Sequence, residues 1–450
     1  MLGIVVSRAD SASLQIGEQL RAIEEWEEDE DESRSKAAGG GTVYRNGEVS
    51  IREFEEWHLH LDRPADAFDD PDLLVFASRH SGETGPLLTA HHTGNFGPAD
   101  HGGEDNELAR ACPNAHSAVL DALERYAPEG YEVGMECTHH GPSEVGAPSM
   151  FVEVGSAETQ WDDADAARAV ARAILDLRDV SPDRPARNGD GTRRQLVGFG
   201  GGHYTPRFER VCRETGWAIG HIGADWGLDA IEDADSLRAV IEQAFEQSAA
   251  EYALVDGERP GLVETVEECG YRAVSETWVR ETDGVDLRFI RAVEQDVATV
   301  EQGLRFGEPA LTHDGTEYAV VSVPDSLLDE VRGIDREATY EAVDSTTLAF
   351  LTDQGGTRPT GPAVLAEQSR RENLIDALID ILDQRYDTVE RTPDRVIARE
   401  RRFDPEKAKT LGVSEGPAFG RLASGETVEI EGRTIPPEKV RTERTVEFEI

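Results

Sequence analysis

The sequence YEVGMECTHHGPSE, residues 131–144, joins a strand-like run to a cluster of polar side chains. Its first five residues read as a strand, and two histidines between two glutamates follow where that strand ends. A second stretch, LVGFGGGHYTP at residues 196–206, has an apolar strand, a glycine turn, a histidine and a helix start. Because ligands of α/β proteins bind beyond the ends of strands, the two stretches predict a catalytic cleft in an α/β domain.

The chain around these stretches alternates strand and helix patterns. The run LLVFAS at residues 73–78 is continuously apolar, which is typical of a central parallel strand. Apolar residues at helical spacing predict amphipathic helices between the strands, so we expect a mostly parallel or mixed sheet. The expected strands are 2–7, 73–78, 87–89, 131–138, 149–154, 196–199, 217–222 and 253–256, the last of them ending the domain, and the expected helices include 14–26, 115–126 and 162–177.

Three segments interrupt this pattern. Residues 26–41 are first acidic and then small, which predicts a solvated surface insert without regular structure. Residues 42–51 alternate around Asn46-Gly47, which predicts a hairpin. Residues 181–193 are rich in Pro, Asp and Gly and predict an irregular connection.

The length of 450 residues predicts two domains. Eleven of the 12 histidines lie in residues 58–221, and the sequence changes character near Val285. We therefore expect a catalytic domain at residues 1–282 and a smaller α+β extension at residues 283–450.

The composition is strongly acidic, with a net charge of −46 and only four lysines among 45 basic residues. Acidic residues spread through periodic sequence are typical of a protein in molar salt, where a Debye length of about 3 Å screens self-repulsion. We infer a cytoplasmic protein of a halophile. The same screening means that charge excludes no nucleic-acid partner. No apolar run approaches the roughly 18 residues of a membrane span, and we expect no membrane partner, no evident protein partner, and a monomer or small homo-oligomer.

Histidine stands at the ends of four predicted strands, and it is both the commonest metal ligand and a group that titrates near neutrality. Four such positions on one sheet edge indicate a functional site. Neighbouring His139 and His140 face one cleft only if the strand has already turned, and Gly141-Pro142 is expected to supply that turn. The four positions are His80, His91 with His92, His139 with His140, and His203.

Two further features flank these histidines. Glu136 and Glu144 are candidates for a metal ligand, a general base or a partner that fixes a histidine tautomer, although a solvated surface explains most of the 91 acidic residues. The turn at residues 200–202 offers N–H groups to a phosphate, carboxylate or oxyanion, with a simple packing turn as the alternative. No Gly-x-Ser-x-Gly elbow is present and the four cysteines are scattered, so covalent serine or thiol catalysis is disfavoured.

Longer motifs carry a resemblance to a known family. They are SRHS at 78–81, HHTGN at 91–95, ECTHHGPSE at 136–144, FVEVGS at 151–156, GGGHYTP at 200–206 and GHI at 220–222. With them the chain resembles, over roughly residues 1–280, the archaeal and plant type of D-aminoacyl-tRNA deacylase. The resemblance implies a three-layer α/β/α fold similar to peptidyl-tRNA hydrolases and nucleoside phosphorylases. It also implies hydrolysis of the ester between a D-amino acid and the tRNA 3′ adenosine, with zinc as cofactor.

The residues that match these motifs define the expected site. The expected catalytic residues are His139, His140, Glu136, His203 and Glu144. Ligands for one or two zinc ions are expected among His91, His139, His140, His203 and Glu136. The expected substrate contacts are His80, Asn95, Thr138, Ser143, Gly200, Gly201, Gly202, Tyr204 and His221. Glu153 also matches the motifs.

The leading hypothesis is a zinc-assisted hydrolase that releases tRNA and a D-amino acid, which serves chiral proofreading and D-amino acid detoxification. In a metal-free variant the histidines orient water and the adenosine 2′-hydroxyl assists. Two other functions stay open, namely a related zinc hydrolase acting on another ester or amide, and a non-catalytic tRNA-binding module with structural histidines. In the extension, LGVSEGPAFGRL at residues 411–422 is similar to a C-terminal segment of tRNA 3′-processing zinc hydrolases, which suggests a substrate-handling or structural module.

Overall fold

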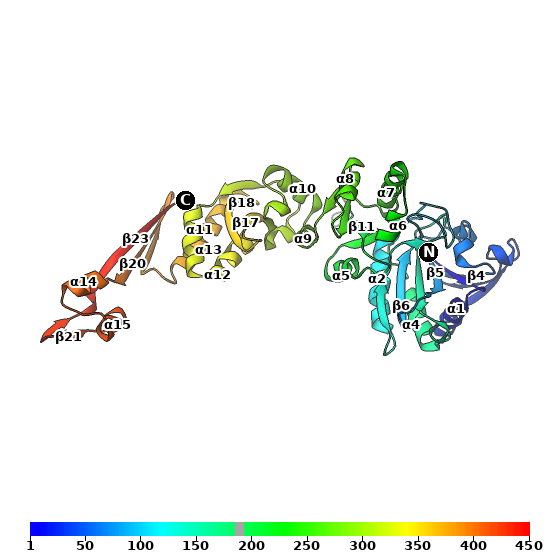
Figure 1. Ribbon diagram of the computed structural model, residues 1–450, viewed down its shortest axis with the longest axis horizontal. Helices are drawn as coiled ribbons and strands as arrows, with labels where there is room; N and C mark the ends of the chain where they lie inside the picture. The colour runs from blue at the N-terminus through cyan, green and yellow to red at the C-terminus, as the bar shows by residue number, and fades with distance from the viewer. Residues whose placement is uncertain (185–192) are drawn as a thin grey trace. The chain divides into compact units, whose positions relative to one another are not determined.

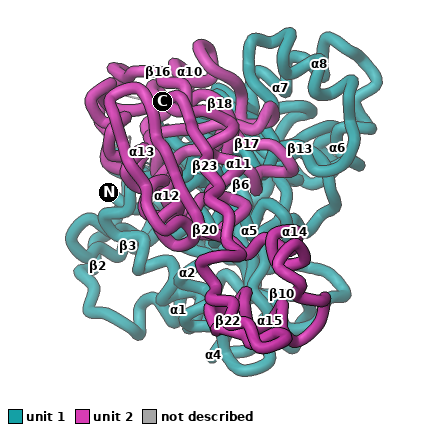
Figure 2. The backbone as a smooth tube through the Cα atoms, turned by 90° about the vertical axis from the view of Figure 1, so that its left-hand side faces the viewer, with its two compact units in different colours: residues 1–283 teal, residues 284–450 magenta. Residues whose placement is uncertain are grey.

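The computed structural model describes residues 1–184 and 193–450. These form two compact units, residues 1–283 and 284–450 (Figure 2). The boundary falls within one residue of the position expected from the sequence. Most of the connection expected at 181–193 lies outside the described residues.

The first unit contains an eight-stranded mixed sheet in the order β2-β3-β4-β1-β5-β10-β6-β8 (Figure 1). The apolar run of β5 lies between two parallel neighbours, β1 and β10, which confirms it as a central strand. β6 runs antiparallel to β10, so the sheet is mixed. The strands are β1 Leu2–Ser7, β2 Glu27–Asp31, β3 Gly41–Asn46, β4 Val49–Phe54, β5 Leu73–Arg79, β6 Leu87–His92, β8 Glu132–Met135 and β10 Ser149–Gly155.

A separate parallel sheet has the order β12-β11-β13-β14. Its strands are β11 Gln195–Gly200, β12 Ala218–Gly223, β13 Tyr252–Asp256 and β14 Arg272–Val274. The expectation that all histidine-bearing strands share one sheet edge is therefore wrong. The physical reason is that β11 already has a parallel neighbour on each side, so its hydrogen-bond ladder is complete without the larger sheet. The expectation that residues 253–256 form the last strand of this unit is also wrong, because β14 follows them.

Helices cover the larger sheet on one face only. On the other face β1, β5 and β10 pack their apolar side chains against short 3₁₀ helices and loops in a core that includes Phe68, Phe76 and Phe151. The three-layer arrangement stays a prediction. None of the described helices combines the length and apolar character needed to cross a bilayer. The helices of this unit are α1 Ser11–Ile23, α2 Pro113–Tyr126, α3 Glu158–Trp161, α4 Ala164–Leu175, α5 Pro206–Glu214, α6 Asp225–Asp229, α7 Ala234–Ser248, α8 Pro260–Glu268 and α9 Glu276–Glu281, with 3₁₀ turns at His58–His60 and Pro64–Ala67.

The acidic insert is not the irregular loop that the sequence predicts. β2 pairs antiparallel with β3, so most of its carboxylates lie on a regular edge strand. Arg52 donates to Asp31 Oδ2 at 2.8 Å and to the Gly39 carbonyl at 2.9 Å, which ties the insert to β4. Cross-strand partners of opposite charge stabilise a strand that its own composition disfavours. The hairpin around Asn46-Gly47 is confirmed by the pairing of β3 with β4.

The second unit has an α+β architecture. It contains the antiparallel sheet β15-β17-β18-β16, the three-stranded sheet β19-β20-β23 and the hairpin β21-β22. Residues 411–422 belong to a small separate core that includes Val413, Leu422 and Val440. The elements are β15 Leu304–Phe306, β16 Ala319–Ser322, β17 Ala349–Asp353, β18 Arg358–Leu365, β19 Thr388–Arg391, β20 Arg395–Phe403, β21 Val428–Ile430, β22 Arg433–Ile435 and β23 Arg441–Glu449, with α10 Leu287–Asp296, α11 Asp325–Ile334, α12 Arg336–Thr346, α13 Arg371–Leu382, α14 Pro405–Thr410 and α15 Pro417–Ala423.

Asp10 connects two elements of the first unit. Its buried carboxylate accepts a hydrogen bond from the Ala12 N–H at 3.0 Å and so caps α1. The same carboxylate accepts the Arg79 backbone N–H at 3.1 Å, where β5 ends. One side chain therefore fixes the helix start beside the end of the central strand.

We expect Asp10→Ala to destabilise the first unit by about 2–3 kcal/mol, because it removes a helix cap and leaves a buried N–H group unpaired. All six tryptophans lie in residues 1–283, so tryptophan fluorescence during a urea titration reports this unit. The control is Asp233→Ala, which removes the exposed cap of α7 that accepts the Ser236 N–H at 2.8 Å, and should cost about 1 kcal/mol or less. Equal losses would show that Asp10 acts only as a cap.

Candidate functional site

A cavity of about 500 Å³ lies in the first unit, which is a size suited to a small molecule or the end of a larger one. It lies between the end of β5, the segment after β8 and the turn after β11. Its lining residues are Trp57, Leu59, Ser78, Arg79, His80, Ser81, Pro98, Asp100, His101, His139, His140, Glu153, His203 and Trp226.

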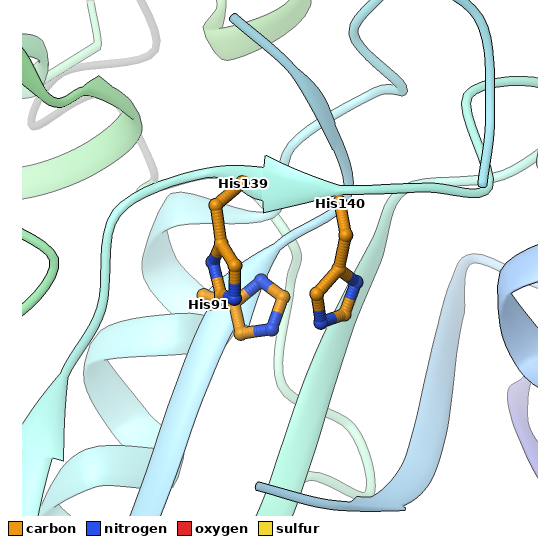
Figure 3. Close-up of side chains that lie close together, drawn as sticks. All are labelled: His91, His139 and His140. Carbon is orange, nitrogen blue, oxygen red and sulfur yellow. The ribbon is translucent and has the colours of Figure 1, made fainter. Parts of the chain in front are cut away.

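His139 and His140 line this cavity and pack against a third histidine, the buried His91. His139 and His140 form the two-residue strand β9 (His139–His140), which pairs with β7 (Gly94–Asn95). Figure 3 shows both rings on one side of β9, next to His91 of β6. The His91 ring centroid lies 4.4 Å from that of His139 and 4.6 Å from that of His140. β8 ends at Met135 and β9 belongs to a separate two-stranded sheet, so the chain has left the larger sheet before it reaches the histidines.

Backbone carbonyls orient all three rings. Each ring places Nδ1 beside a carbonyl oxygen, which only accepts hydrogen bonds, so Nδ1 carries the proton and Nε2 carries a lone pair. The ligand atoms of the three residues lie within 4.8 Å of one another. The bonds are His91 Nδ1 to the His92 carbonyl at 2.9 Å, His139 Nδ1 to the Cys137 carbonyl at 2.9 Å and His140 Nδ1 to the Gly141 carbonyl at 3.3 Å.

Burial keeps these imidazoles neutral. It lowers the pKa of His91 well below the ordinary value, and the neighbouring His139 and His140 lower that pKa further. Burial, with the adjacent His140, likewise lowers the pKa of His139 well below its usual range. For His140 burial lowers the pKa to about 4. Three uncharged rings with free lone pairs therefore converge at one point near neutral pH.

The buried carboxylate of Glu136 lies among the other histidines. His80 Nδ1 is 3.1 Å from Glu136 Oε1, and His203 Nε2 is 3.3 Å from Oε2, with His139 Nε2 at 3.9 Å. Both oxygens lack a well-aligned hydrogen bond from any described residue. Burial alone would raise the pKa of Glu136, but the contacts with His203, His80 and His139 outweigh burial and lower that pKa. Glu136 is therefore the ionised group of the site.

A second buried carboxyl group, Glu153 on β10, has the opposite bias. Burial raises the pKa of Glu153 well above its ordinary value, and the charge of Glu136 raises it further. His80 lies between the two, with Nδ1 at 3.8 Å from Glu153 Oε2 and Nε2 at 2.8 Å from the Tyr204 hydroxyl. Two carboxyl groups with opposite pKa shifts are the arrangement that separates base from acid in many active sites.

Four expected substrate contacts lie outside the cavity lining and form hydrogen bonds with neighbouring segments. Asn95 Nδ2 donates to the Gly102 carbonyl at 2.9 Å, and Ser143 Oγ accepts the Glu104 N–H at 3.0 Å, so both hold the loop that carries His101. Thr138 Oγ1 and His221 Nδ1 lie 3.1 Å apart. The other ring nitrogen of this His221 donates to the Ala109 carbonyl at 2.8 Å, so its role in the structure is to hold two segments together.

Two other expected features lie apart from the histidines. The side chain of Glu144 is 74% exposed, 3.9 Å from Arg63, and lines a different cavity, so the structure does not bring it to Glu136. Gly200 and Gly201 adopt φ of +95° and +80°, and a Cβ on Gly200 would lie 2.2 Å from the Asp256 carbonyl oxygen. These glycines, with Gly202, form a packed turn outside the cavity lining, and α5 begins only at Pro206.

The cavity also contains residues that sequence reasoning missed. Trp226, on α6, is 49% exposed and lines the opening, and His101 enters from a loop. Nothing in the local sequence of these two residues marks them. Arg79 has a signal that was not used, because it stands inside the SRHS motif between a buried strand and His80.

Comparison with known proteins identifies the family. The family described as D-aminoacyl-tRNA deacylase matches residues 67–274. The D-aminoacyl-tRNA deacylase of Haloarcula marismortui is 57% identical over 99% of this chain and 99% of its own length, and that of Natronomonas pharaonis is 52% identical over 100% of both. A crystal structure of a conserved protein of unknown function is 30% identical and covers 63% of this chain and 98% of that one, with a TM-score of 0.54. The chain therefore belongs to the D-aminoacyl-tRNA deacylase family, whose members are enzymes.

Proposed function

We propose that the first unit hydrolyses the ester bond of D-aminoacyl-tRNA in the histidine-lined cavity and releases tRNA and a free D-amino acid. Family membership supplies the substrate class. The observation that carries the chemistry is the convergence of three neutral imidazoles, each with a ring nitrogen within 4.8 Å of the others, of which His139 also lies 3.9 Å from the buried, ionised carboxylate of Glu136. This arrangement suits activation of water near neutral pH.

The donor set fits zinc. Three imidazole nitrogens with room for one more ligand are typical of catalytic zinc sites, and His91, His139 and His140 would hold the ion. Their Nδ1 bonds to backbone carbonyls are the outer contacts that keep zinc-binding histidines in the right tautomer. When bound, zinc lowers the pKa of water and polarises the ester carbonyl. His80, Glu136 and His203 form a second group of suitable size, which supports one or two ions.

The protein's own groups handle the protons. Glu136 Oε2 accepts a proton from the attacking water and passes it to His203 Nε2, 3.3 Å away, while His203 Nδ1 releases a proton to the departing ribose oxygen. The side chain of His203 is 33% exposed, so it reaches the open side of the cavity where the leaving tRNA lies. Glu153 keeps its proton and adds no second negative charge. Cys137 stays a thiol because burial raises its pKa, so it takes no part as a thiolate.

Several finer features belong to the same proposal. Strong acidity with few lysines supports a cytoplasmic enzyme that works in high salt, serving proofreading and D-amino acid detoxification. The likeness to peptidyl-tRNA hydrolases, the contacts of residues 200–202 with substrate and a monomeric or small homo-oligomeric state also stay predictions. The metal-free mechanism, in which the 2′-hydroxyl of the adenosine assists, predicts full activity without zinc.

Zinc binding is tested by elemental analysis of protein purified without chelator. We expect one or two zinc ions in the wild type and loss of at least one in His91→Ala and His139→Ala, because each variant removes a ligand. His60→Ala, which changes an exposed histidine outside the cavity, should keep the wild-type content. A wild-type protein that is active and free of zinc would contradict the metal proposal and favour the mechanism in which the 2′-hydroxyl assists.

Chirality is tested by incubating the protein with D-tyrosyl- and L-tyrosyl-tRNA. We expect the D-ester to be cleaved more than about tenfold faster, a difference of about 1.4 kcal/mol in the barrier, and free D-tyrosine to be released. Equal rates for both esters would refute the claim of chiral selection, and cleavage of neither would refute the deacylase activity.

The two carboxyl groups predict different responses to the same isosteric change. Glu136→Gln removes the ionised base, so kcat should fall by about 10²-fold or more. Glu153→Gln replaces a protonated carboxyl by a neutral amide of the same shape, so its activity should stay within about tenfold. Infrared spectra at neutral pH should show the band of a protonated carboxyl that disappears in Glu153→Gln. A comparable loss of activity in both variants, or no such band, would show that Glu153 is ionised.

A further inference from the structure

The guanidinium of Arg79 is held at the cavity in an unusual way. Arg79 is the last residue of β5, immediately before His80, and both line the cavity with His139. Its Cζ lies 4.4 Å from the ring centroid of Trp57 and 4.5 Å from that of Trp161. Two indole rings therefore stabilise the cation without using its N–H donors.

Among the described residues no carboxylate forms an ion pair with this guanidinium, although its charge acts on the buried carboxyl groups of Asp10 and Glu153. In the described parts of the chain no carboxylate oxygen lies within 4 Å of the Arg79 guanidinium, and Asp10 accepts a hydrogen bond from the backbone N–H of Arg79, not from its side chain. Acidic residues outnumber basic ones by 91 to 45, so counter-ions are abundant, and other arginines such as Arg52 and Arg207 are paired. A half-buried arginine whose donors stay free in a cavity indicates that the cavity receives an anion.

The geometry points to a role that rests on the proposed function: we propose that Arg79 binds the phosphate that joins the 3′-terminal adenosine of tRNA to the preceding nucleotide. The esterified amino acid has lost its carboxylate and carries a cationic α-amino group. The phosphates are therefore the only anionic groups at this end of the substrate. The nearest one belongs to the same nucleotide as the ester, and a cavity of about 500 Å³ accepts one aminoacylated nucleotide.

Arginine suits this task better than lysine, because its planar fork of N–H groups binds two phosphate oxygens at once. Arg79 and His80 are adjacent at the end of a buried strand, so a phosphate on Arg79 fixes the ribose relative to the histidines. The net charge of −46 repels a polyanion as a whole, so a local cation supplies attraction where the ester must bind.

Two small substrates that differ only in the phosphate group measure the contribution of this contact. They are the 2′(3′)-D-tyrosyl esters of adenosine and of adenosine 5′-monophosphate, compared with wild type and Arg79→Met, whose apolar stem still fills the space between the indoles. For the wild type we expect the phosphate to raise kcat/KM by about 10- to 150-fold, mainly through KM, as a charge-assisted hydrogen bond does. Arg79→Met should lose this advantage and cleave the adenosine ester at the wild-type rate, and Arg79→Lys should keep part of it.

Arg172→Met is the matched control. Arg172 is exposed on α4 with its Cζ 5.7 Å from the ring centroid of Tyr126, and lies outside the cavity lining, so the variant removes the same charge from another aromatic contact. It should retain the phosphate advantage. If Arg79→Met slows both esters equally, Arg79 only shapes the site and the proposal is wrong, as it is if the advantage persists.

A binding measurement without turnover distinguishes failure of the phosphate contact from failure of the proposed deacylase activity. If the wild type cleaves neither ester, calorimetric titration with adenosine 5′-monophosphate still tests Arg79. Weaker binding of the nucleotide to Arg79→Met than to Arg172→Met, with adenosine binding unchanged, supports the phosphate contact. Equal binding of the nucleotide to both variants overturns it.

Discussion

Backbone hydrogen bonds from the end of β8 and the segment after it to the turn after β11 and to β12 hold the two sheets of the first unit together. The Cys137 N–H donates to the His203 carbonyl at 2.9 Å, the Thr138 N–H to the Ile222 carbonyl at 2.9 Å and the Thr205 N–H to the Met135 carbonyl at 3.0 Å. The contact of Glu136 with His203 depends on this junction, because Glu136 follows β8 of the larger sheet and His203 follows β11. The cavity is thus a product of the seam between two sheets, and a register change of one residue along the seam would turn these side chains away.

Burial then assigns the charges. The imidazoles of His91, His139 and His140 are neutral, Glu136 is ionised and Glu153 is protonated, because desolvation and close neighbours act on each group differently. The negative charge of Glu136 and the lone pairs of the neutral imidazoles together suit a cation. Arg79 supplies a positive group at the same cavity for the opposite end of the nucleotide. The proposed metal-binding histidines and the proposed phosphate-binding arginine thus occupy separate parts of the site.

Much of the first unit can be predicted from local patterns. The apolar run of β5 and the hairpin around Asn46-Gly47 follow from periodicity and turn chemistry, which depend on neighbours along the chain. The strand β2 could not be predicted, because its acidic side chains are compensated by arginines on other strands. The division into two sheets could not be predicted for a similar reason. Strand order depends on pairing between distant segments and not on the pattern of either one.

The sequence by itself determined which chemistry is available. Histidines and glutamates at the ends of strands, in motifs long enough to indicate a family, favour hydrolytic chemistry in an α/β domain. Only the tertiary structure decided that Glu144 lies on an exposed surface, that His221 supports the wall and that Arg79 reaches the cavity. The physical reason is that charge state and accessibility depend on burial and on neighbours remote in the chain, which no local pattern encodes.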